Sequence, residues 1–408
     1  MLPRQPETGK GIALLGDEER KAVLEVLESR SLFRYYGPDL RAKVEGFERA
    51  AAERLGTAYS VATSSGTAAL RVALAALGVG CGDEVVVPAF TFIASVNAVV
   101  SMGAVPVFGE IDETLGLDPT RLADAVSDRT TAVMAVHLEN GACDLDPILA
   151  VTDQRGLPLL EDTAQSMGAS YHGRPLGSFG ALGAFSLQLE KNVTAGEGGL
   201  VTTDDHTLWL RAARYQDQGG QFVTSQGSER GTDEVPAFVG ENLRMTEIAG
   251  AIAGVQLSRL DGLLATQRAN WNRIRAGIQA RPGLEFRRQP DPDGDGGSSL
   301  HVFLPDRDTA KRFARALIAE NVPAGQMYRG RPVYATESIL EKRTVSRKGG
   351  PWNCAEHPCA IEYRMGMCPQ TEELVARSGI IVVAASYSPD TCDGIAEAVN
   401  KVAEAVLV

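Results

Sequence analysis

GTAALRVALAALGVGCGDEVVVPAFTFIASVNAVVSMGAVPVF, residues 66–108, alternates two helical patterns with two short apolar runs. The helical patterns predict helices over 66–77 and 92–102. The apolar runs, with two later ones, predict strands over 84–87, 105–108, 131–136 and 157–160. None of these strands alternates apolar with polar residues, so both faces of the sheet should be buried. Strands that alternate with helices predict an α/β fold with a mostly parallel, doubly wound sheet.

On either side of this segment the pattern predicts helices and a second domain. Amphipathic spacing predicts helices over 17–31 and 40–55, and a long helical stretch over 246–278 joins two domains. Short strands at 284–286 and 301–304 then indicate a smaller α+β domain. We expect a large domain over residues 1–265 and a small C-terminal domain over 266–408.

Composition excludes several classes of protein. The 408 residues are 44% hydrophobic and 23% charged, which is typical of a globular chain. The net charge of −12 and the pI of about 5.1 disfavour nucleic-acid binding. Residues 1–16 lack the apolar core of a signal peptide, and apolar runs such as 380–385 are too short to span a bilayer. We therefore expect no membrane association and a cytoplasmic location.

The six cysteines and one acidic loop do not predict a metal site. The cysteines are Cys81, Cys143, Cys354, Cys359, Cys368 and Cys392. They form no Cys-x-x-Cys pair, so reduced thiols are the expectation. The loop 289–299 resembles the start of a calcium-binding loop at Asp291, Asp293 and Asp295, but Val302 stands where a bidentate glutamate is required. This loop is expected to be a solvated turn.

Two sites at the ends of predicted elements offer binding chemistry. Ser64 to Ala68 precede a helix, where free amides can bind a phosphate, although an ordinary serine cap also explains them. Glu161 and Asp162 end an apolar strand, which is where ligands of open α/β sheets bind. A carboxylate at that point can pair with a cationic ring nitrogen, or it can simply cap a helix.

Lys191 lies between a strand-like run and a glycine-rich turn, in FSLQLEKNVTAGEGG, residues 185–199. A lysine becomes nucleophilic when burial or nearby cations lower its pKa. Most lysines are solvated, so the setting of Lys191 rather than its residue type carries the prediction. The spacing is not Ser-x-x-Lys, which excludes a β-lactamase-type site.

These motifs together resemble the DegT/DnrJ/EryC1/StrS sugar aminotransferases, a branch of the fold type I enzymes that use pyridoxal 5′-phosphate (PLP). The resemblance runs from about Tyr36 to the C-terminus. The matching motifs are SGTAAL (65–70), GDEV (82–85), PAFTF (88–92), GAVPVF (103–108), EDTAQ (161–165), SLQLEKNVTAGEGG (186–199) and GENLRM (240–245). Relatives with histidine in place of the lysine are dehydratases, so Lys191 implies an aminotransferase.

The resemblance implies a role for each matching residue. Lys191 would bind the cofactor aldehyde covalently and later move a proton between the substrate and the cofactor. Asp162 would face the pyridine nitrogen, with Gln165 near the phenolic oxygen and Phe92 stacked on the ring. The cofactor phosphate would be bound by Gly66, Thr67 and Ser186, and by Asn242 of a partner subunit. This arrangement implies a homodimer with shared active sites, with residues 219–240 as the arm that crosses over.

The resemblance also implies the reaction. Glutamate or glutamine would convert PLP to pyridoxamine 5′-phosphate, and the amine would then pass to a keto-sugar, nucleotide-linked in our principal hypothesis. A free keto-cyclitol of the scyllo-inosose type, with glutamine as donor, is the second hypothesis. A non-catalytic regulatory protein is the third, and the intact Lys191 and Asp162 argue against it.

Several other residues have two open interpretations. Gly180-Ala181 and the run Gln188 to Glu190 depart from the family pattern and are expected beside the cofactor, where they would affect substrate choice. His137 follows a strand and either faces the site or is a buried structural histidine. Residues 33–36 either contact substrate near the entrance or only pack. We expect a further aromatic cluster on the small-domain side, formed by Trp352, His357 and Tyr363.

Overall fold

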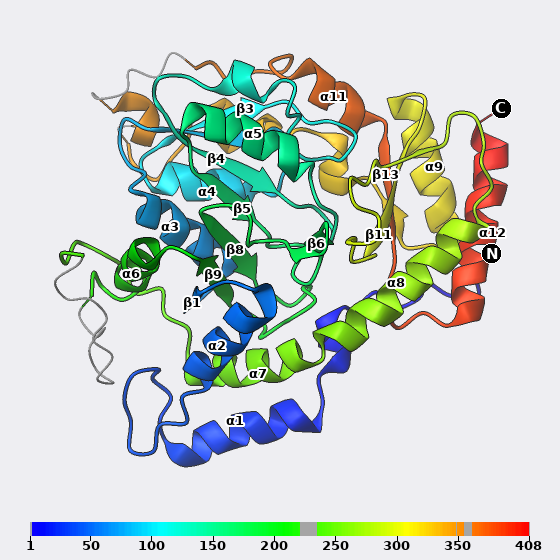
Figure 1. The fold of residues 1–408 in the computed structure, drawn as a ribbon. Coiled ribbons are helices and arrows are strands. Elements are labelled where there is room, and N and C mark those ends of the chain that lie inside the picture. Colours follow the sequence, from blue (N-terminus) through cyan, green and yellow to red (C-terminus); the bar gives the residue numbers. More distant parts are fainter. Residues whose placement is uncertain (1, 221–234, 348, 355–360, 408) are drawn as a thin grey trace.

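The computed structural model describes residues 2–220, 235–347, 349–354 and 361–407. A seven-stranded sheet forms the centre of the larger part, in the order β1-β9-β8-β5-β4-β2-β3 (Figure 1). Its strands are β1 (Tyr59–Thr63), β2 (Glu84–Pro88), β3 (Val105–Gly109), β4 (Thr130–Val136), β5 (Leu159–Asp162), β8 (Leu182–Ser186) and β9 (Gly199–Thr203). The neighbours from β3 to β8 are parallel, and β9 is antiparallel to both β8 and β1. The predicted mostly parallel α/β sheet is confirmed.

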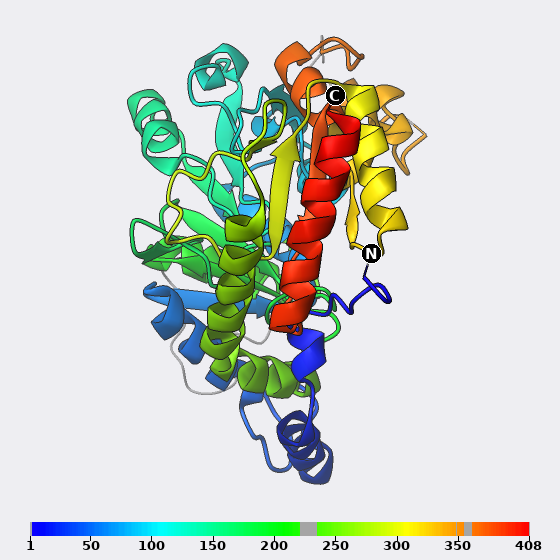
Figure 2. The same cartoon turned by 90° about the vertical axis from the view of Figure 1, so that its right-hand side faces the viewer.

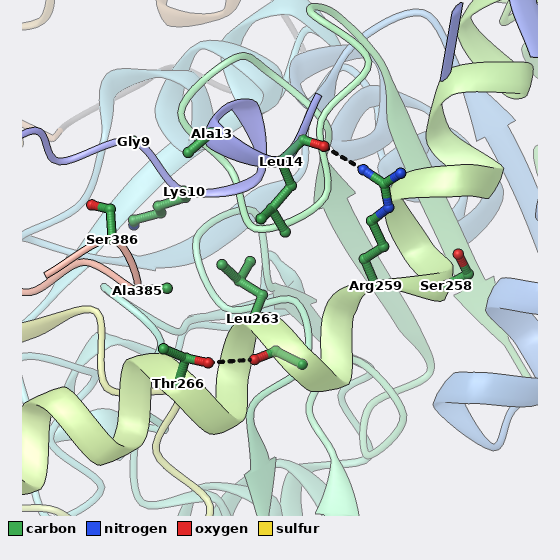
Figure 3. Close-up of a pocket in the computed structure, with 11 residues that line it drawn as sticks. Gly9, Lys10, Ala13, Leu14, Ser258, Arg259, Leu263, Thr266, Ala385 and Ser386 are labelled. Atoms are coloured by element: carbon green, nitrogen blue, oxygen red, sulfur yellow. Dashed lines mark hydrogen bonds between the residues drawn. The ribbon is translucent and has the colours of Figure 1, made fainter. Parts of the chain in front are cut away.

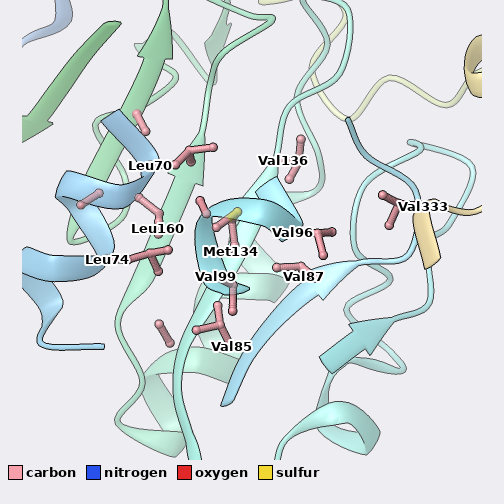
Figure 4. Close-up of a cluster of buried hydrophobic side chains, with 14 of the residues drawn as sticks. Leu70, Leu74, Val85, Val87, Val96, Val99, Met134, Val136, Leu160 and Val333 are labelled. Atoms are coloured by element: carbon pink, nitrogen blue, oxygen red, sulfur yellow. The ribbon is translucent and has the colours of Figure 1, made fainter. Parts of the chain in front are cut away.

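Helices cover both faces of this sheet because its strands are apolar on both sides. Val85 and Val87 pack with α3 (Gly66–Leu77) and α4 (Ile93–Ser101), whereas Val86 packs with α5 (Leu145–Arg155) on the opposite face. Figure 4 shows the first of these clusters, in which Leu70 and Leu74 lie with Met134 and Leu160. The β9 end is covered by α2 (Lys43–Leu55), α7 (Glu247–Ser258) and the start of α8 (Leu260–Gly277).

The remaining helices complete the outer layer. The part built on the large sheet also holds α1 (Asp17–Ser29), α6 (His206–Tyr215), α10 (Glu337–Leu340) and α11 (Pro369–Ala376). Two short strands, β6 (Ser170–Tyr171) and β7 (Arg174–Pro175), form a separate hairpin. The helical stretch expected over 246–278 consists of two helices, α7 and α8, which meet at a bend of 52°.

The smaller part is an antiparallel sheet in the order β10-β11-β13-β12, covered by helices (Figure 2). Its strands are β10 (Glu285–Phe286), β11 (Ser299–Phe303), β12 (Ala324–Gly325) and β13 (Ser378–Val382), and its helices are α9 (Arg307–Ala319) and α12 (Pro389–Val406). Leu2 packs in this core from the other end of the chain, and Val333 and Leu374 pack in the core of the large sheet. The division at residue 265 stays a prediction, since segments from both sides cross it.

Two cysteines correct the expectation of reduced thiols, because Cys81 and Cys354 form a disulfide. Trp352 and Tyr363 hydrogen bond to each other, and the Tyr363 hydroxyl donates to the carbonyl of Pro106 in β3. This packing places the Cα atoms of Cys81 and Cys354 6.7 Å apart, within bridging distance. Cys143, Cys368 and Cys392 are free and buried, and Cys359 lies outside the described residues.

The same packing corrects the placement of the aromatic cluster. Trp352 and Tyr363 lie in the core of the large sheet rather than on the small-domain side. They pack there because the Tyr363 hydroxyl finds its acceptor on β3. His357 lies outside the described residues.

The loop 289–299 is only partly the solvated turn that its acidic sequence predicts. Asp295 accepts from the amide of Gly297 and from Gln289, and its carbonyl accepts from Arg268. The amide of Gly296 donates to the carbonyl of Asn140 at 2.9 Å. The second half of the loop is therefore buried against the wall of the large domain. Within the described ranges, no three acidic, histidine or cysteine side chains are grouped to hold a metal ion.

Across the residues that the structure describes, no single helix combines the length and apolarity needed to cross a membrane. Among these residues, the bent pair α7 and α8 reaches that length and apolarity when the two helices are taken together.

Candidate active site

A cavity of about 630 Å3 opens at the carboxyl ends of the parallel strands. Most of its lining comes from the large sheet and its helices. The C-terminal part of the chain completes the lining with Met327, Tyr328 and Ile380. The structure brings together all of the predicted site residues except Asn242: Gly66, Thr67, Phe92, Asp162, Gln165, Ser186 and Lys191. Asn242 is exposed and does not line this cavity in the single chain.

The N-terminus of α3 forms the anion-binding end of the cavity. Gly66 and Thr67 are the first two residues of the helix, where backbone amides have no intrahelical acceptor. The Ser65 hydroxyl caps the helix by accepting from the amide of Ala68 at 3.1 Å. A Cβ at Gly66 would lie 2.6 Å from the Cβ of Ser186, so only glycine lets these elements approach so closely. Free amides and a serine hydroxyl at this point fit a phosphate.

Asp162 is a buried carboxylate at the end of β5. Its Oδ2 accepts from the Ser95 hydroxyl at 2.7 Å, and its Oδ1 accepts from the amide of Ala164 at 3.1 Å. Burial raises the pKa of Asp162, against the lowering effect of these bonds and of the Lys191 charge. The raised pKa means that the groups around Asp162 do not fully compensate for the burial of its ionised form. A protonated ring nitrogen would supply the missing positive charge.

Lys191 lies in the turn that follows β8. Its backbone is fixed by two bonds, from its own amide to the carbonyl of Gln188 at 3.0 Å and from the amide of Gly11 to its carbonyl at 3.1 Å. Burial lowers the pKa of the Lys191 ammonium, and the nearby charge of Lys10 lowers it further. These effects favour the neutral amine, which is the nucleophilic form.

Aromatic and amide side chains form the walls between these two ends. Phe92 is 53% exposed at the cavity, and its ring centre lies 6.2 Å from that of Tyr328. Gln165 donates to the Tyr328 hydroxyl at 3.0 Å, and its Oε1 accepts from the amide of Glu139 at 3.3 Å. An exposed aromatic ring and polar amides in the lining of one cavity suit a planar heteroaromatic ligand.

Sequence reasoning missed Lys10, Glu139 and Tyr328. Glu139 and Asn140 are consecutive residues with left-handed backbone, with φ of 50° and 64°, as are Tyr328 and Arg329, with φ of 48° and 59°. Such backbone is uncommon outside glycine and gathers at functional sites. The Asn140-Gly141 pair was a turn signal in the sequence, but nothing local marked Tyr328.

His137 is a structural residue. It is fully buried, its Nε2 lies 3.1 Å from the Glu161 carboxylate, and its Nδ1 accepts from the amide of Cys143 at 3.3 Å. His137 does not line the active-site cavity. Of its two open interpretations, the structural one holds.

Gly180-Ala181 also lies away from the cavity, which corrects the prediction that it borders the cofactor. The amides of Phe179 and Gly180 donate to Glu161, and a Cβ at Gly180 would lie 2.4 Å from the carbonyl of Leu159. The Gly180-Ala181 pair, which departs from the family pattern, therefore affects the packing against β5 rather than the cavity. Gln188 does line the cavity, as predicted.

Residues 33–36 do not line the cavity of their own chain. Arg34 and Glu48 form a buried ion pair at 2.8 Å, and the Tyr35 hydroxyl accepts from Gln216 at 2.9 Å. Tyr36 is 59% exposed on the surface. Residues 221–234 of the predicted crossing arm lie outside the described residues.

Comparison with known proteins agrees with this geometry. The model of the DegT/DnrJ/EryC1/StrS aminotransferase family matches residues 14–378. The chain belongs to this family. It is a PLP-dependent aminotransferase, which excludes the non-catalytic alternative. When bound, PLP supplies an electron sink for the substrate carbon. The chemistry of Asp162, of the N-terminus of α3 and of Lys191 fits its ring nitrogen, its phosphate and its aldehyde, which these residues would hold.

Three relatives show the range of the family. The aminotransferase is 36% identical over 335 residues to L-glutamine:scyllo-inosose aminotransferase of Streptomyces griseus, which covers 78% of this chain and 75% of the relative. It is 39% identical over 254 residues to GDP-perosamine synthase of Caulobacter vibrioides. This alignment covers 62% of this chain and 65% of the synthase. DesV of S. venezuelae has a crystal structure with a TM-score of 0.81 and 28% identity, which covers 98% of this chain and 99% of DesV.

Proposed function

We propose that this aminotransferase transfers an amino group from glutamate or glutamine to the carbonyl carbon of a nucleotide-linked keto-sugar, in the biosynthesis of an amino sugar. The observation that carries the proposal is that Lys191, Asp162 and the N-terminus of α3 line the same cavity. The sequence similarity of the chain to GDP-perosamine synthase, whose name contains a nucleotide, supports a nucleotide-linked acceptor.

The chemistry of the cavity walls supports a polyhydroxylated acceptor. Besides the residues proposed to hold the cofactor, Glu139, Gln188 and Glu197 line the cavity. Carboxylate and amide oxygens accept hydrogen bonds from sugar hydroxyl groups. These residues would orient the keto carbon toward the amine of the loaded cofactor, where Lys191 would transfer the proton.

A second acceptor is a free keto-cyclitol with glutamine as donor, which the likeness to the Streptomyces griseus enzyme favours. The two are separated by measuring amine transfer from glutamate and from glutamine to a nucleoside-diphosphate keto-sugar and to scyllo-inosose. The proposal expects the larger kcat/KM with the nucleotide-linked ketone. Transfer to the cyclitol alone would overturn it.

We further propose that the enzyme works as a homodimer with shared sites. The amide of Ser64 donates to the carbonyl of Leu243 at 2.8 Å, which places Asn242 next to the turn that leads into α3 but outside its own cavity. Asn242 is exposed, so its amide is accessible to a second subunit. There it would contribute to the phosphate site.

A further inference from the structure

Residues 2–14 form a strap that joins the small domain to the active-site lysine. At one end Leu2 packs in the small-domain core, and its amide donates to the carbonyl of Glu320 at 3.1 Å. Midway, the Ser386 hydroxyl donates to the carbonyl of Glu7 at 2.9 Å. At the other end the amide of Gly11 bonds to the carbonyl of Lys191. The strap thereby fixes Lys10 next to the active-site turn.

The ammonium of Lys10 lies 3.2 Å from Oε2 of Glu139, with 12% and 21% of the two side chains exposed. Glu139 lines the active-site cavity, whereas Lys10 lines a second cavity of about 580 Å3. Figure 3 shows this second cavity between the strap, with Lys10 and Leu14, and helix α8, with Leu263 and Thr266. The ion pair therefore lies in the wall that separates the active site from the outer cavity.

Glu139 is held rigidly, so its charge has a fixed position. Its amide donates to Gln165, and its carbonyl and Oε2 both accept from the Ser298 hydroxyl, at 3.0 Å and 3.3 Å. Burial raises the pKa of the Glu139 carboxyl, but the charge and the hydrogen bond of Lys10 oppose it, and the net direction is a lowered pKa. Glu139 is therefore an anion at neutral pH.

The charged groups that face Lys191 come from four separate segments. Lys10 on the strap favours the neutral amine, and Glu139 after β4, Asp162 at the end of β5 and the neighbouring Glu190 favour the ammonium. Removal of Lys10 would leave these three carboxylates without that opposing charge.

The remaining titratable groups in this region are neutral or lie on the cavity wall. Burial lowers the pKa of His301 to about 3, so it carries no charge at neutral pH. Burial raises the pKa of the Tyr328 hydroxyl, which stays protonated. Glu197 lines the same cavity. The buried guanidinium of Arg287 interacts with Glu139, whereas Lys10 is the cation that acts on Lys191.

We propose that Lys10 is a positioning residue of the active site: paired with Glu139, it offsets the field of that carboxylate and so favours the neutral amine of Lys191, the form that captures the cofactor. The inference rests on the proposed role of Lys191. Capture forms a C=N bond between the Lys191 nitrogen and the aldehyde carbon, breaks the C=O bond and releases one water, without oxidation or reduction. It requires a lysine that has already lost its proton.

Two measurements on the full-length chain test this inference. The first is the rate at which added PLP is captured, followed by absorbance across a range of pH. The second is trace acetylation of Lys191 by acetic anhydride in the absence of PLP, followed by peptide mass spectrometry, which reports the free amine without any catalysis. Both give the pH at which half of Lys191 is deprotonated.

Lys10→Met should raise this midpoint by about one pH unit. At a pH below both midpoints, about tenfold less free amine would then remain. Glu139→Gln should lower the midpoint, and the double variant should return toward the wild-type value. Lys10→Arg keeps the charge and should keep the midpoint. Lys311→Met removes a lysine from an exposed pair with Asp308, at 3.7 Å on α9, and is the matched control that should change nothing.

The outcomes separate the inference from the proposed function. An unshifted midpoint in Lys10→Met, with capture abolished by Lys191→Ala, would overturn the inference and leave the function intact. Capture at another lysine would overturn the proposed role of Lys191. If Lys10→Met does not fold, Glu139→Gln decides, because an unchanged midpoint in that variant contradicts the proposal.

Discussion

Asp162 illustrates at the residue scale how one group serves chemistry at the expense of stability. Replacement of Asp162 by Asn removes the charge proposed to hold a protonated ring nitrogen. We expect kcat/KM for amine transfer to fall at least ~100-fold, as for other fixed electrostatic groups of active sites. Asp146→Asn, an exposed aspartate on α5, is the control. Activity of Asp162→Asn within a few-fold of wild type would contradict the assignment.

The same substitution should stabilise the cofactor-free protein at neutral pH. Burial raises the pKa of Asp162, so the folded chain binds this proton more tightly than the unfolded chain. Stability is therefore lost as the pH rises through the pKa of the folded state. Urea unfolding should show Asp162→Asn as the more stable protein at neutral pH, with the difference vanishing below ~3.9, the pKa of an unfolded aspartate. A less stable variant at neutral pH would be the opposite result.

The sequence was sufficient to place Lys191 and Asp162 in one cavity, because each lies in a dense local motif, Asp162 at the end of β5 and Lys191 in the turn after β8. It was insufficient for Lys10 and Glu139, which are separated by 129 positions. Their pairing depends on where the strap crosses the active-site turn, at the bond from the amide of Gly11 to the carbonyl of Lys191. No local pattern in residues 9–11 encodes that crossing, so only the folded chain reveals it.

At the scale of elements, the strap depends on Gly11. A Cβ at this position would lie 2.5 Å from the carbonyl of Asn192 and 3.0 Å from that of Lys191. Gly11→Ala should therefore push the strap away from the active-site turn, weaken PLP binding and destabilise the protein by about 1–3 kcal/mol. Denaturant unfolding and cofactor titration would measure both effects.

Gly262→Ala is the matched control for this substitution. Gly262 lies within α8, with no atom within 4 Å of the added Cβ. There the same change should stabilise the helix by about 0.5–1 kcal/mol. Equal effects of the two substitutions would show that the close approach of the strap is unimportant.

The strands of the large sheet were predictable because continuous apolar runs leave few alternatives to a buried parallel sheet. The break between α7 and α8 was not, because helical periodicity continues through residues 258–260. Arg259 lies at this break, and it donates to the carbonyl of Leu14 and pairs with Glu18 at 2.8 Å. The bend is therefore associated with long-range contacts to the N-terminal segment.

At the scale of the whole molecule, the Cys81–Cys354 disulfide joins positions 273 residues apart. A cross-link over so long a loop restricts the unfolded chain, and its loss should cost about 2–4 kcal/mol. Cys81→Ser, Cys354→Ser and the double variant should lower the free energy of unfolding equally without reductant. With reductant, wild type should resemble all three. Additive costs of the single variants would show that the two cysteines act independently.

Shared active sites predict complementation between two inactive chains. In a mixed dimer of Lys191→Ala and Asn242→Ala subunits, one site combines an intact Lys191 with an intact Asn242 from the other chain. Co-refolding the two variants should therefore restore activity that neither has alone. If Asn242 serves its own chain, mixing will restore nothing.

The most direct measurement of the central claim is reduction of the PLP-loaded enzyme with borohydride, followed by proteolysis and peptide mapping. The account predicts one pyridoxyl label, on Lys191, and its loss in Lys191→Ala. A label on another lysine, or no label on a chain that still transfers amines, would contradict it.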